Sequence, residues 1–121
     1  MPFEIKMGSD GILRIELSGD LDKTILETFR RELNPYLEAS TPAKPLKNIV
    51  YFKQFGTLAP SIRHYLTDLN RDQRLGCTAY IHPPTRGRVL GHFILKATGR
   101  HNIEFFEQEQ DAVKWLQNHT G

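Results

Sequence analysis

Residues 49–52, Ile49-Val50-Tyr51-Phe52, decide the fold class of this chain. A short continuous apolar run of this kind is typical of a strand that is covered on both faces, as in a parallel sheet. Gly56 follows the run, and Pro60 is well placed in the first turn of a helix. The sequence therefore predicts a central strand that leads through a loop into a helix.

The same alternation of strand and helix continues toward the C-terminus. The second helix is expected to run from Pro60 to Leu75, and a buried strand over 77–81 stops at Pro83-Pro84. A third helix then begins near Thr85, with Gly99 as its C-terminal cap, and a strand over 103–106 and an amphipathic helix over 112–116 end the chain. The buried side of the third helix is expected to consist of Val89, Leu90, Phe93, Ile94 and Ala97.

Toward the N-terminus the pattern predicts a hairpin and one long helix. Apolar and charged residues alternate over 3–7 and 12–17, on either side of the turn signal Ser9-Asp10-Gly11. Asp20 or Asp22 can cap the helix that follows. Its apolar residues are Ile25, Leu26, Phe29, Leu33 and Leu37. Pro35 lies inside this helix and is expected to kink or break it near Asn34.

The element order is thus β-β-α-β-α-β-α-β-α, which predicts an α/β fold. Strands joined through helices pair in parallel with right-handed crossovers, and the opening hairpin adds an antiparallel strand. We expect a single domain over residues 1–121, with a mixed sheet of about five strands and about four helices.

Composition excludes several classes of protein. The 121 residues are 39% hydrophobic and 25% charged, so disorder of the whole chain is not expected. A net charge of +2 makes a nucleic-acid partner unlikely. The chain shows no secretory signal and no apolar stretch that could span a membrane, so the expected location is the cytoplasm.

Motifs for catalysis or for cofactors are absent from the sequence. The five histidines lack metal-ligand spacing, and neither a glycine-rich phosphate loop nor G-x-S-x-G occurs. The single cysteine, Cys77, lies in a predicted buried strand, where a structural role is ordinary. We therefore expect no metal, no cofactor and no enzyme, with an unrecognised enzyme that uses His82 or His92 as the remaining catalytic alternative.

The main polar cluster of the sequence lies at the start of the third helix. Thr85, Arg86 and Arg88 combine a hydroxyl and two guanidinium groups with free helix N–H groups, an arrangement that can bind an anion or a partner. The alternative is an ordinary solvated helix face.

The element order, together with particular residues, resembles the STAS domain (sulfate transporter and anti-sigma factor antagonist). Residues 11–22 are similar to the second strand of that family and its "L-x-G-x-L-D" exit. Residues 88–95 and the ending over 105–116, a phenylalanine, acidic residues and then Ala-x-x-Trp-Leu, resemble a SpoIIAA-like bacterial branch often labelled STAS/SEC14-like. The resemblance spans nearly the whole chain and implies a mixed α/β sheet and a binding module without catalysis.

The resemblance also implies a place for regulation. In the family, a serine or threonine at the start of the second helix is phosphorylated, in a D-S/T-S-G-L setting. Here the corresponding residues 57–63 lack the aspartate and the glycine, so the motif is degenerate. Ser61 is the serine in register, and Thr57 is the second candidate phosphoacceptor. The alternative role for Ser61 is to cap the helix.

Two functions remain in view besides the unrecognised enzyme. The first is a regulatory module that binds a protein partner such as a kinase, an anti-sigma factor or a similar regulator. The second is a small-molecule or lipid-binding module with an apolar pocket. A homodimer is possible under either function, through an exposed sheet edge or through the helix that contains Phe93.

Overall fold

The computed structural model describes residues 3–119 and begins with the expected hairpin. Strand β1 (Phe3–Met7) pairs antiparallel with β2 (Ile12–Leu21), so that Ile5 lies opposite Ile15. Asp10 closes the turn, because its Oδ1 accepts a hydrogen bond from the N–H of Ile12 over 3.1 Å. The N-terminal hairpin of the sequence analysis is confirmed.

Three further strands and four helices follow within the described residues. β3 (Leu46–Leu58), β4 (Leu75–Ile81) and β5 (Ile103–Phe106) extend the sheet in parallel, in the spatial order β1-β2-β3-β4-β5. The helices are α1 (Lys23–Glu38), α2 (Ile62–Asn70), α3 (Thr85–Thr98) and α4 (Glu109–Asn118). The predicted α/β class and the mixed sheet are confirmed. Within the described residues, no helix is long and apolar enough to cross a membrane.

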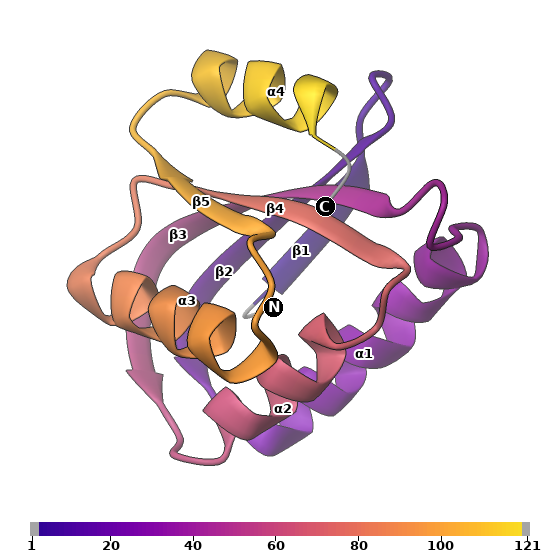
Figure 1. Cartoon of the computed structure of the whole chain (residues 1–121). Coiled ribbons are helices and arrows are strands. Elements are labelled where there is room, and N and C mark those ends of the chain that lie inside the picture. The colour runs from indigo at the N-terminus through magenta and orange to yellow at the C-terminus, as the bar shows by residue number, and fades with distance from the viewer. Residues whose placement is uncertain (1–2, 120–121) are drawn as a thin grey trace.

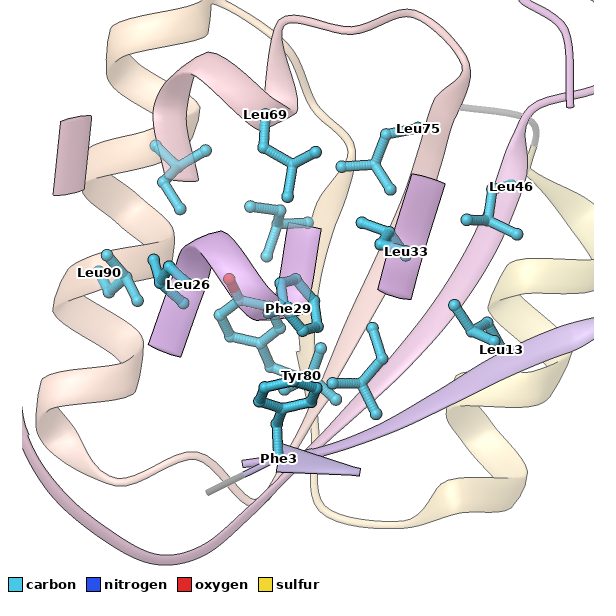
Figure 2. Packing of buried hydrophobic residues seen from close by; sticks show 14 of the residues in the cluster. Phe3, Leu13, Leu26, Phe29, Leu33, Leu46, Leu69, Leu75, Tyr80 and Leu90 are labelled. Atoms are coloured by element: carbon cyan, nitrogen blue, oxygen red, sulfur yellow. The ribbon is translucent and has the colours of Figure 1, made fainter. Parts of the chain in front are cut away.

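The helices cover both faces of the sheet unequally. Helices α1, α2 and α3 lie on one face and α4 lies on the other (Figure 1). The larger core fills the space between the sheet and α1–α3, where Phe29, Leu33 and Tyr80 are buried (Figure 2). The smaller core lies under α4 and consists of Ile12, Ile49, Cys77, Ala79, Ala112 and Leu116. Ile49 and Val50 therefore belong to opposite cores, as the apolar run predicts.

Helix α1 corrects the expectation about Pro35. Asp22 is its N-cap and accepts a hydrogen bond from the N–H of Ile25 over 2.9 Å. The expectation of a break at Pro35 is wrong, because the helix continues to Glu38. Pro35 is exposed, while Leu33 and Leu37 are almost fully buried on either side of it. Burial of these leucines holds the last turn in place despite the missing N–H.

Helix α3 corrects the expectation about its buried side. Leu90 and Ile94 are buried as expected, but Val89 is 58% exposed and Ala97 is also exposed. The rest of the buried stripe is made by two glycines, Gly87 and Gly91. Glycine lets the helix backbone approach the sheet closely, and hydrophobicity alone does not identify such a face.

Candidate partner-binding groove

A groove of about 460 Å³ lies where β3 and β4 end and α2 and α3 begin. Parallel strands place their carboxyl ends at the same edge of a sheet, so the starts of both helices meet there. The groove is lined by Thr57, Ala59, Pro60, Arg63, Thr85, Arg86, Val89 and Leu90. The structure thus brings residues of two separately predicted clusters, Thr57 of the first and Thr85 and Arg86 of the second, into one depression.

Asp20 holds the segment that contains Thr57. Its Oδ1 accepts a hydrogen bond from the backbone N–H of Thr57 over 2.7 Å. That bond, the hydroxyl of Thr57 and, to a smaller extent, the charge of Arg86 lower the pKa of the Asp20 carboxyl group. A Cβ atom at Gly56 would lie 2.0 Å from the same Oδ1, so only glycine leaves room for the carboxylate. Asp20 thus tethers the end of β3 to the end of β2.

The residues of the predicted cluster at the start of α3 point to different sides of the helix. Arg86 lines the groove, whereas Arg88 lies outside it. The Arg88 guanidinium is 3.4 Å from Oε1 of Glu107 and stacks 5.5 Å from the ring centre of Phe105. Two residues along a helix correspond to a rotation of about 200°, which is why the two arginines point to different sides.

The two candidate phosphoacceptors have different surroundings. Ser61 is exposed and occupies the N-cap position of α2, yet its side chain makes no capping hydrogen bond. The alternative that the Ser61 side chain caps the helix is therefore wrong. The hydroxyl of Thr57, in contrast, interacts with the Asp20 carboxylate. The Ser61 hydroxyl is the less constrained of the two.

His82 and His92, the histidines of the catalytic alternative, do not line the groove. Nδ1 of His82 pairs with the carboxylate of Glu107, and the His92 ring centre lies 4.9 Å from that of Phe105. His82 has a positive φ of 46°, directly before Pro83. These contacts explain both side chains as parts of the outer surface around β5 and α3.

Sequence analysis missed the places of three residues, of which Arg63 and Val89 line the groove and Asp20 holds its Thr57 segment. Asp20 was considered only as a helix cap, and Val89 was assigned to the core. Arg63 was not singled out; its guanidinium lies 5.1 Å from the ring centre of Phe93. Asp20 and Gly56 would indicate the bond to Thr57 only if the register of β2 and β3 were known. No local pattern in the sequence provides that register.

Comparison with solved structures identifies the fold. The structure of the unphosphorylated anti-sigma factor antagonist SpoIIAA matches with a TM-score of 0.66 at 15% identity, over 98% of this chain and 99% of that chain. An uncharacterized protein of the DUF3478 family from Shewanella loihica, with a SpoIIAA-like fold, matches with a TM-score of 0.69 at 18% identity, over 94% and 91%. An anti-sigma factor antagonist from Mycobacterium paratuberculosis matches with a TM-score of 0.62 at 14% identity, over 95% and 92%.

Comparison at the level of sequence adds nothing to this, because no family model and no curated protein matches the chain. The structural matches extend over nearly the whole length of each chain. The chain therefore has the SpoIIAA-like α/β fold, the fold that its resemblance to STAS domains implies.

Proposed function

We propose that this chain is a regulatory module without catalytic activity, and that it binds a partner protein through the groove between α2 and α3. The observation that carries the proposal is the joint placement of Arg63, Arg86 and the exposed Val89 in one depression at the start of two helices. The shared fold with anti-sigma factor antagonists supports a regulatory role.

The chemistry of the groove favours a partner segment that is both acidic and apolar. Val89 and Ala59 offer apolar surface, and its burial by a partner favours binding. The two guanidinium groups and the helix N–H groups favour a carboxylate or a phosphate beside that apolar contact. A negatively charged segment with an aliphatic or aromatic side chain combines both contacts.

We propose Ser61 as the residue that is phosphorylated for regulation. A phosphate there would add a charge of about −1.5 to −2 at the start of α2, two residues before Arg63, where the helix dipole favours an anion. It would compete with the acidic group of the partner for the same cations. A phosphate on Thr57 would instead meet the Asp20 carboxylate, which repels it.

The test compares variants of the groove in affinity purification with crosslinking from the native host. A partner captured by the wild-type chain should be lost with Arg86→Glu and with Val89→Asp, and retained with Lys96→Glu, an exposed change elsewhere on α3. Intact-mass measurement of the same preparations should show a phosphate increment that Ser61→Ala removes and Thr57→Ala retains. A partner captured equally by all variants would contradict the groove, and an increment that survives Ser61→Ala would contradict the modification site.

The alternative of a lipid-binding module has little support from the interior. The larger core contains a cavity of about 60 Å³ lined mainly by apolar side chains, among them Phe29, Val50 and Leu69. An engineered cavity that binds benzene measures about 150 Å³. The cavity here is less than half that size, so a lipid chain does not fit in it. The cavity also contacts Asn48, whose Oδ1 has no hydrogen-bond partner in the described residues, and this favours a water molecule as occupant.

A further inference from the structure

Strand β1 presents an open edge with a defined pattern of backbone groups. It is the terminal strand of the sheet, and among residues 3–119 only β2 pairs with it. The N–H of Gly8 donates to the carbonyl oxygen of Ile12 over 2.9 Å, so the hydrogen-bonded positions of the hairpin are the even-numbered residues of β1. The N–H and C=O groups of Phe3, Ile5 and Met7 therefore point away from β2, toward the open edge.

The two charged side chains of this strand lie opposite like charges within the chain. Glu4 is opposite Glu16, and Lys6 is opposite Arg14. Like charges in directly opposed positions destabilise a sheet. Among the described residues, Glu16 pairs with Lys53 and Arg14 pairs with Asp10, whereas Glu4 and Lys6 have no ion pair. Both side chains are exposed.

We propose that the open edge of β1 binds the same edge of a second copy, as an antiparallel pair about a two-fold axis at Ile5. This register opposes Ile5 to the partner's Ile5, and Phe3 to the partner's Met7. Each of these pairs can exchange backbone hydrogen bonds, because the edge groups of all three residues point outward. The result is one continuous sheet through both copies.

The same register satisfies the charges that the single chain leaves unpaired. Glu4 lies opposite the partner's Lys6, and Lys6 lies opposite the partner's Glu4. These are non-hydrogen-bonded positions, where opposed side chains are closest. A shift of the register by one residue would place odd-numbered residues opposite even-numbered ones. The backbone N–H and C=O groups of the even-numbered residues point toward β2, so the hydrogen bonds between the two copies could not form. The sequence Phe-Glu-Ile-Lys-Met is self-complementary only in this antiparallel register.

Apolar contacts add to the pairing on the opposite face of the strand. Met7 is 39% exposed and is one of two large hydrophobic side chains exposed among the described residues, Val89 being the other. In the proposed pair, Met7 packs beside the partner's Phe3 and thereby loses exposed surface. No residue of β1 lines the groove between α2 and α3, so a dimer would present two grooves at once.

The test uses charge reversal and sedimentation equilibrium across a range of concentrations. The wild-type chain should reach twice the mass of its 14.0-kDa monomer. Glu4→Lys or Lys6→Glu alone creates two repulsive pairs across the axis, so each should raise the dimer dissociation constant about tenfold or more. The double variant Glu4→Lys with Lys6→Glu restores opposite charges and should return the constant to near the wild-type value. Lys96→Glu is the matched control and should leave it unchanged.

A second measurement separates this proposal from a mere structural effect. Each single reversal places opposite charges across β1 and β2, beside Glu16 or Arg14, and should leave the monomer as stable as the wild type or more stable. Weaker dimers together with undiminished monomer stability are the expected result. A wild-type chain that stays monomeric at millimolar concentration would overturn the proposal, and so would a dimer that the single reversals do not weaken or that the double reversal does not restore.

Discussion

Gly91 shows how one residue sets the distance between a helix and the sheet. A Cβ atom at this position would lie 2.8 Å from Cζ of Phe105 and 3.3 Å from Cε2 of Tyr80. Real Cβ atoms do not approach a ring carbon so closely, so the ring or the helix would have to move. Phe105 also supports the guanidinium of Arg88 and the ring of His92, which a displaced ring would disturb.

We therefore expect Gly91→Ala to destabilise the protein, against the ordinary trend. Inside a helix, alanine is usually more stable than glycine by about 0.5–1 kcal/mol. Here overpacking should lower the free energy of unfolding by about 1–3 kcal/mol, as measured by urea denaturation. Gly87→Ala should lower the free energy of unfolding by less. A Cβ atom there would lie 3.2 Å from its nearest neighbour, the Phe52 ring. A Gly91→Ala variant as stable as the wild type would show that the contact relaxes freely.

At the level of elements, α1 shows that packing overrides a local breaker. Pro35 cannot donate the hydrogen bond that would reach the carbonyl of Arg31. The helix nevertheless ends in a regular way, with the N–H of Ala39 donating to the carbonyl oxygen of Pro35 over 3.2 Å. The free energy gained by burying Leu33 and Leu37 exceeds the cost of the missing bond.

Pro35→Ala should consequently stabilise the protein. The substitution restores one helical hydrogen bond and removes a steric conflict, with an expected gain of up to about 3 kcal/mol in the free energy of unfolding. Pro42→Ala, in the exposed loop before β3, is the control and should give no gain, because loss of proline there only increases the freedom of the unfolded chain. Equal effects of both changes in urea denaturation would contradict this account of α1.

At the scale of the whole molecule, two cores share one sheet. Every strand from β2 to β4 contributes side chains to both cores, as Ile49 and Val50 illustrate. In the described part of the chain, α4 is the one helix on the second face, and its Ala112 and Leu116 are fully buried. Because the sheet couples the two layers, α4 should not detach before the rest of the protein unfolds.

This coupling can be measured with the single tryptophan of the chain. Trp115 belongs to α4, and its ring centre lies 5.7 Å from that of Phe106. Leu116→Ala should lower the free energy of unfolding by about 2–5 kcal/mol. Tryptophan fluorescence and far-ultraviolet circular dichroism should still give coincident transitions in urea, both in this variant and in the wild type. A fluorescence transition that comes first would show that α4 unfolds independently.

Much of this fold could be predicted because its signals are local. Alternating residues identified the hairpin, the run at 49–52 identified the central strand, and helical spacing identified α1 and α2. Asp22 and Gly99 act as caps at the expected positions. The buried side of α3 was predicted only in part, because two of its four buried residues are glycines, and glycine has no side chain that marks a face.

Several residues of the candidate site could be predicted individually, but their meeting in one groove could not. Thr57, Thr85 and Arg86 were candidates for separate reasons, and only the parallel crossovers place them around one groove. Arg88 has the same side chain as Arg86, yet the turn of the helix directs it to Glu107.

The sequence by itself determined which segments become strands and helices, since hydrophobic periodicity and capping act over a few residues. Only the tertiary structure decided the order of the strands, the tether from Asp20 to Thr57 and the exposure of Val89. These features join residues far apart along the chain, and their free energies arise from packing and hydrogen bonds that exist only once the sheet has formed.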